Sequence, residues 1–160
     1  MMLAYQSGRW IFLVFVLLCA VQDLKEQAVS FRIFLVMFAA ETIWYLISFC
    51  SGNSVPFLLL LKGAGVGAVL FILNKITDGA IGEGDAFFFL AVGFFAGLPL
   101  SLLIFAGSLF LSGLFSLVIL TVGSCSGKNM HHRRIPFLPF AAVPSVLLFL
   151  LESGFLKRGI

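Results

Sequence analysis

The chain has 160 residues, of which 61% are hydrophobic and only 11% are charged, and its mean hydropathy is +1.16. This composition excludes a soluble globule, because too few polar residues remain to cover one, and it predicts an integral membrane protein within a lipid bilayer. The net charge of +3 is small, and the basic residues lie between apolar runs. This pattern favours a role in setting the orientation of the chain in the membrane over nucleic-acid binding.

Breaks at glycine, proline, asparagine, serine and charge clusters divide the apolar sequence into six predicted membrane-spanning helices. The predicted spans are residues 3–22, 31–50, 55–73, 85–98, 100–122 and 136–151. No internal repeat or low-complexity tract separates them, so we expect one polytopic domain over residues 1–160. The expected fold class is therefore all-α, a bundle of about six transmembrane helices.

One apolar run is too long for a single crossing. Residues 85–123 would form a helix about 59 Å long at about 1.5 Å per residue, roughly twice the thickness of a bilayer core. The run must therefore fold back, and Gly97-Leu98-Pro99 is the natural corner.

Basic residues decide the predicted orientation. If the loop after the first span lies in the cytoplasm, most basic residues between spans lie inside. Those inside are Lys25, Arg32, Lys75, Lys128, Arg133 and Arg134, and those outside are Arg9, Lys157 and Arg158. The positive-inside rule favours this arrangement, which also places Asp23 and Asp85 on the cytoplasmic side.

Two charged residues, Glu41 and Lys62, fall deep inside predicted spans, whereas Arg9 lies in the outer half of the first span. Counting the helical rise from each span end puts Glu41 about 15 Å and Lys62 about 18 Å from the cytoplasmic boundary. We therefore predict a structural ion pair between them, because a buried charge needs a partner. The alternative is an ion or proton path through the bundle.

The cysteine and histidine patterns predict no metal site and no cofactor. Cys19, Cys50 and Cys125 are widely spaced and form no C-x-x-C pair, so neither a disulfide framework nor a zinc site is expected. The adjacent His131 and His132 lack a third ligand and are typical of a solvated basic loop.

Asp23 and Asp85 each stand at the boundary of an apolar run, where an ionisable group is costly unless it has a role. Two neighbouring carboxyls do not both ionise easily, so one keeps a proton while the other acts as a base on water. Gly82 and Gly84 carry no side chain, so a peptide substrate could approach Asp85 closely. Taken singly, each aspartate has a non-catalytic explanation. Asp85 could be a carboxylate that stabilises the N-terminus of a helix, and Asp23 could be a charged residue that ends a membrane span.

Three motifs in order resemble the type IV prepilin peptidases, the G-x-G-D family of membrane aspartyl proteases. The motifs are Asp23-Leu24-Lys25, Gly82-Glu83-Gly84-Asp85 and Ile135-Pro136-Phe137-Leu138-Pro139-Phe140. The resemblance implies an endopeptidase that removes the leader of type IV prepilins or pseudopilins at the cytoplasmic face of the bacterial cell (inner) membrane. Asp23 and Asp85 would be its catalytic pair, with no metal or cofactor.

The sequence departs from the family pattern at several places. Phe87 stands where the family usually has lysine, Ala28-Val29-Ser30 replaces its I-P-N, and Leu138 replaces a glycine. The N-terminal cysteine-containing extension associated with methylation has no counterpart here, so methylation is not expected. These departures leave an alternative, a non-catalytic paralogue acting as a membrane assembly factor or a small transporter.

Overall fold

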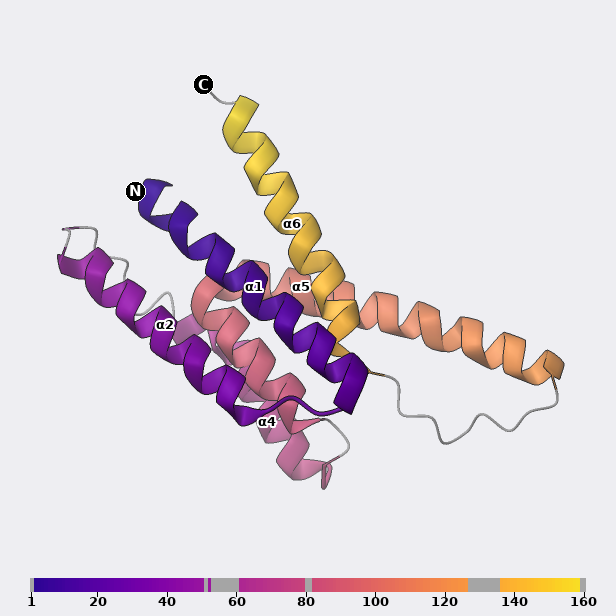
Figure 1. Cartoon of the computed structure of the whole chain (residues 1–160). Coiled ribbons are helices and arrows are strands. Elements are labelled where there is room, and N and C mark those ends of the chain that lie inside the picture. The colour runs from indigo at the N-terminus through magenta and orange to yellow at the C-terminus, as the bar shows by residue number, and fades with distance from the viewer. Residues whose placement is uncertain (1, 51, 53–60, 80–81, 127–135, 159–160) are drawn as a thin grey trace.

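The computed structural model describes residues 2–50, 52, 61–79, 82–126 and 136–158, and these form helices joined by turns, with no strand among them (Figure 1). The helices are α1 (Met2–Glu26), α2 (Phe31–Cys50), α4 (Gly65–Ile76), α5 (Glu83–Ser126) and α6 (Leu138–Arg158). The predicted all-helical class is confirmed. The helix α2 has the bounds of the second predicted span.

The helix α1 continues past the predicted end of the first span. It runs to Glu26 rather than stopping at Gln22, so Asp23 lies in its last turn. The next residue, Gln27, has a φ of 51° and its N–H donates to the Asp23 carbonyl at 2.9 Å. The chain therefore reverses immediately after the helix and leads directly into α2.

The predicted corner at Gly97 is confirmed. Residues on both sides of it are helical, but Gly97 itself has φ 75° and ψ 174°, a conformation that favours glycine. Pro99 follows two residues later and has no N–H to bond back across the break. The second segment of α5 consequently leaves the bundle in a new direction (Figure 1).

Glycines bring α4 and the first segment of α5 into close contact. A Cβ built on Gly67 would overlap the backbone of Leu90, and one built on Gly63 would overlap the Gly93 carbonyl. Residues 61–63 are helical and α4 follows them, whereas the start of the third predicted span lies outside the described residues. The helices approach closely because these small residues permit it.

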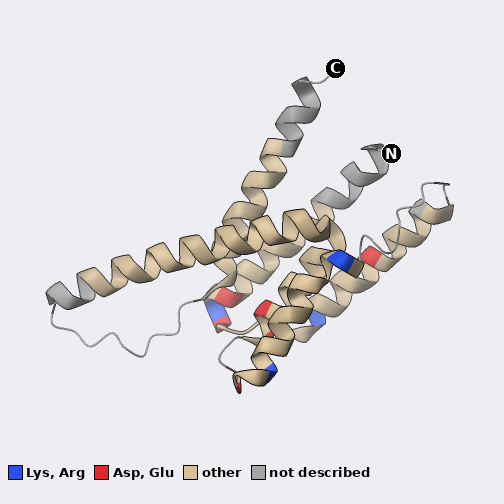
Figure 2. Ribbon diagram, turned by 180° about the vertical axis from the view of Figure 1, so that it is seen from behind, with Lys and Arg blue, Asp and Glu red and all other residues tan. Residues whose placement is uncertain are grey.

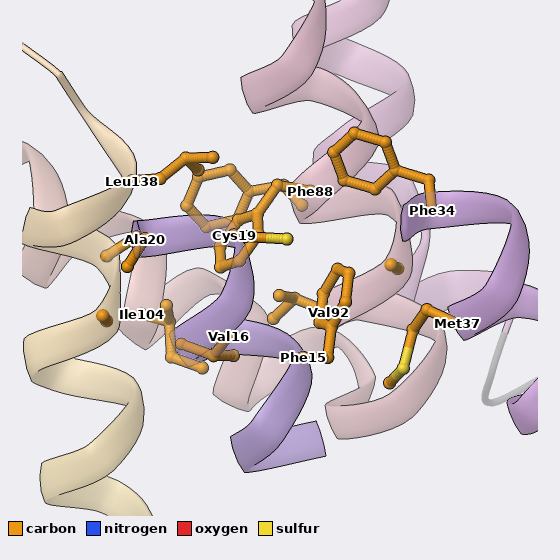
Figure 3. Close-up of a cluster of buried hydrophobic side chains, with 14 of the residues drawn as sticks. Phe15, Val16, Cys19, Ala20, Phe34, Met37, Phe88, Val92, Ile104 and Leu138 are labelled. Carbon is orange, nitrogen blue, oxygen red and sulfur yellow. The ribbon is translucent and has the colours of Figure 1, made fainter. Parts of the chain in front are cut away.

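The helix α5 is central to the bundle, because it contacts each of the other four described helices. Its buried side chains meet those of α1, α2 and α6 in one cluster (Figure 3). The labelled members are Phe15, Val16, Cys19, Ala20, Phe34, Met37, Phe88, Val92, Ile104 and Leu138. Many large apolar side chains on the outer surface stay exposed, as expected of a protein that contacts lipid.

Within the described part of the chain, one helical stretch, Glu83–Thr121, is long and apolar enough to cross a membrane. A shorter apolar helix covers Leu138–Leu151. No charged residue interrupts the second segment of α5 (Figure 2). The six-span arrangement itself stays a prediction.

Candidate active site

Asp23 is held by the start of α6. Its side chain is 8% exposed, and its Oδ2 accepts a hydrogen bond from the Leu138 N–H at 2.9 Å. The first N–H groups of a helix have no partner within the helix and carry the positive end of its dipole, so they favour a carboxylate. Pro139 is tolerated in this first turn, where its missing N–H costs nothing. The motif around Leu138 therefore positions Asp23, a role that the sequence did not predict.

The ionisation of Asp23 is set by two opposing effects. The residue lies beyond the end of the first predicted span, and burial raises its pKa above the usual range. Backbone N–H groups of Leu138 and Phe137 oppose this by stabilising the charged form. The net shift is upward, so Asp23 keeps its proton to a higher pH than an exposed aspartate does.

Asp85 lies in the first turn of α5, and its own backbone forms the turn that precedes the helix. The Asp85 N–H donates to the Gly82 carbonyl at 3.1 Å. A Cβ built on Gly82 would lie 3.0 Å from Asp85 Oδ2, tighter than ordinary packing. At Gly84 a Cβ would only meet Val29 at 3.8 Å. The structure thus gives a steric reason for glycine at position 82 but not at position 84.

The two aspartates line one cavity of about 720 Å³, which we call the aspartate cavity. Its walls come from the end of α1, the loop to α2, the turn before α5 and the start of α6. The lining residues are Asp23, Gln27, Ala28, Val29, Gly79, Gly82, Glu83, Gly84, Asp85, Pro136, Phe137 and Leu138. The Asp23 and Asp85 carboxyls are close enough to interact electrostatically. The structure therefore brings together the two residues that the sequence singled out.

Glu83 is a third carboxylate on this cavity, and it is exposed at the rim. Figure 2 shows acidic residues at the end of the bundle where α1 ends and α5 begins. The lining of the aspartate cavity therefore carries three carboxyl groups and no lysine or arginine.

The loop between α1 and α2 is fixed by a side-chain hydrogen bond. The Ser30 N–H donates to Gln22 Oε1 at 3.1 Å, and the Gln22 amide donates to Glu26 at 3.0 Å. The segment over residues 27–29 is thereby placed against the aspartate cavity. Ala28-Val29-Ser30, which stands where the family has I-P-N, contains no proline.

The two other departures from the family pattern are packed into apolar surroundings. Phe87 is half-buried and its ring contacts those of Phe31, Phe34 and Phe71, with centroids 5.6 to 5.8 Å apart. It does not line the aspartate cavity. The Leu138 side chain is buried in the core beside Ala20 and Phe88 (Figure 3), while its N–H serves Asp23.

The predicted ion pair between Glu41 and Lys62 is not formed in the structure. Glu41 Oε1 is buried without a hydrogen-bond partner, and Lys62 is exposed. Gly63 packs against α5, and successive helical residues are rotated by about 100°, so Lys62 is turned away from that contact. The prediction compared positions along the helix axes only and did not consider rotation about them.

No group of three or more histidine, cysteine, aspartate or glutamate side chains in the described ranges is arranged to hold a metal ion. Cys19 is buried and Cys50 is exposed, and both are free thiols. His131 and His132 lie outside the described residues. The residues with polar side chains on the lining of the aspartate cavity are Asp23, Gln27, Glu83 and Asp85.

Comparison with known families adds an independent finding. The sequence model of the type IV leader peptidase family matches residues 10–117, more than half of the chain. The matched region includes Asp23 and the Gly82–Asp85 turn, and it ends before the segment that begins α6. Comparisons with curated proteins and with solved structures give no match.

Proposed function

Because the chain belongs to the type IV leader peptidase family, we propose that Asp23 and Asp85 form the catalytic pair of an aspartic endopeptidase. The observation that carries this proposal is that one cavity holds both carboxyls, which come from positions 62 residues apart in sequence. We propose that the substrate is the leader of a type IV prepilin or pseudopilin, cleaved at the cytoplasmic face of a bacterial cell membrane.

The proposed mechanism uses one proton shared by the pair. The ionised carboxylate takes a proton from a water molecule, which attacks the scissile carbonyl. The protonated carboxyl polarises that carbonyl and then delivers its proton to the leaving amine. No covalent intermediate is needed, and the roles belong to the pair because coupled groups titrate as a unit.

The start of α6 supports this mechanism. The Leu138 N–H fixes one oxygen of Asp23, which keeps the carboxyl oriented toward the cavity that it lines. Gly82 leaves Asp85 the room to lie against its own turn. Gly82 and Gly84 would also allow the backbone of an extended substrate to come close to Asp85.

The rival proposal, a small transporter, needs a polar path to Glu41. The cavity beside Glu41 is instead walled mainly by aromatic side chains. This arrangement favours the peptidase. A non-catalytic assembly factor would have the same aspartate cavity but would not cleave a peptide bond there.

The proposal is tested by co-expressing the chain with a prepilin and following leader removal by mass spectrometry of the product N-terminus. Asp23→Asn and Asp85→Asn should each slow leader removal by at least about 100-fold, the scale of general acid–base catalysis. Glu41→Gln is the matched control outside the cavity and should process normally. Equal leader removal by all variants and the parent would refute the assignment.

A further inference from the structure

A second cavity of about 220 Å³ lies between α2 and α5, and we call it the aromatic cavity. It is lined by Phe38, Glu41, Thr42, Trp44, Tyr45, Phe94 and Phe95. It shares no residue with the aspartate cavity. Phe94 follows Asp85 by nine positions, so the cavity lies roughly 14 Å along the first segment of α5 from the aspartate cavity.

Glu41 lacks a partner in this cavity. Among the described residues, its Oε1 is the only buried side-chain nitrogen or oxygen without a hydrogen bond. The neighbouring Thr42 hydroxyl donates to the Phe38 carbonyl at 2.7 Å, so that proton is already in use. A buried acceptor left without a donor is costly, and an unpaired carboxyl within a membrane bundle indicates a functional site.

The aromatic walls are held in place by further ring contacts. Phe94 meets Phe38 edge to face, with centroids 5.9 Å apart and an interplanar angle of 87°. Phe95 stacks on Phe12 of α1 with centroids 4.7 Å apart. The faces of aromatic rings attract cations, and most strongly where water is excluded. The cavity thus combines one unpaired carboxyl oxygen with walls suited to a cation.

We propose that the aromatic cavity binds the primary ammonium group of an amphiphilic amine that enters from the lipid. An ammonium N–H would donate to Glu41 Oε1, and its charge would balance the carboxylate and lie against the rings. The cavity is smaller than a site for a drug-sized ligand, so it takes the head group alone. The alkyl chain would lie along exposed apolar side chains of α2 that follow the cavity residues by one helical turn, such as Leu46 and Phe49.

Trp44 makes the proposal measurable. The chain has two tryptophans, and a Trp10→Phe background leaves Trp44, on the cavity wall, as the single tryptophan, which can be excited selectively over tyrosine. In phosphatidylcholine nanodiscs, decylammonium should change the Trp44 emission saturably. Decyltrimethylammonium, which has no N–H, and decanol, which has no charge, should bind at least about fivefold more weakly, because a charge-assisted hydrogen bond is lost.

Variants separate this site from simple partitioning into lipid. Glu41→Gln keeps the side-chain shape and should weaken decylammonium binding at least about tenfold. Phe94→Leu keeps the carboxyl and should weaken it about threefold. Lys62→Met is the matched control and should leave the affinity unchanged. Undiminished binding to both Glu41→Gln and Phe94→Leu, or an equal saturable response to decanol, would overturn the proposal. A loss of decylammonium affinity in Lys62→Met alone would also overturn it, because Glu41 would then act together with Lys62 rather than with the aromatic walls.

Discussion

Asp23 and Glu41 are carboxylates on neighbouring helices, but they differ in hydrogen bonding. Asp23 stands at the end of α1, where the start of α6 supplies an N–H at 2.9 Å. Glu41 stands in the middle of α2, where neighbouring helices have already used their N–H groups, and its Oε1 has no partner. The comparison shows that a helix start can supply a donor to a buried acid, whereas the middle of α2 leaves Glu41 Oε1 without one.

Removing the Leu138 N–H should leave Asp23 Oδ2 without a hydrogen bond, as Glu41 Oε1 is now. Leu138→Pro deletes the N–H at a position where proline is otherwise tolerated, and it should lower kcat/KM for leader removal about tenfold or more. Leu138→Ala keeps the N–H and removes the buried side chain, so it should mainly lower thermal stability. The two variants are compared by steady-state cleavage and thermal unfolding. If Leu138→Ala lost as much activity as Leu138→Pro, packing rather than the hydrogen bond would position Asp23.

The pH profile sharpens the comparison further. Catalysis needs the pair to hold one proton, and burial raises the pKa of Asp23. Activity should therefore fall as pH rises through the upper apparent pKa of the pair, approaching about tenfold per pH unit, and fall again in acid when both carboxyls are protonated.

Leu138→Pro removes a group that stabilises charged Asp23, so it should move the profile to higher pH. Glu41→Gln should leave the profile in place, because Glu41 lies in the other cavity. Profiles of kcat/KM measured for the three proteins test this expectation. A flat profile between pH 4 and 9 would be inconsistent with a shared proton.

The smallest expected effect concerns the two glycines before Asp85. Gly82→Ala would bring a Cβ to 3.0 Å from Asp85 Oδ2 and should lower kcat about threefold by displacing the carboxyl. A Cβ on Gly84 would meet only Val29, at 3.8 Å, so Gly84→Ala should leave kcat nearly unchanged. Should Gly84→Ala raise KM instead, the glycine serves the approach of the substrate. Separate kcat and KM values decide between these readings.

Much of this arrangement could be predicted from the sequence, because it follows from local patterns. The bounds of α2 and the break at Gly97 follow from apolar run length and from glycine and proline chemistry. The resemblance carried by the Asp23 and Gly82–Asp85 motifs is confirmed by the family match. These features depend on a few neighbouring residues.

Features that depend on how helices rotate and meet could not be predicted. The hydrogen bond between Asp23 and the Leu138 N–H joins residues 115 positions apart, and no motif spacing reveals it. Glu41 and Lys62 lie at similar predicted depths, yet they do not pair, because depth says nothing of direction. The packing of Phe87 against Phe31 likewise depends on α2 lying beside α5.

The most direct test of the central claim is a double-mutant cycle on kcat/KM for prepilin cleavage with Asp23→Asn, Asp85→Asn and the double variant. Two carboxyls that share one proton act as a unit, so the double variant should be no slower than either single variant. Losses that multiply in the double variant, or full activity in either single variant, would contradict the account.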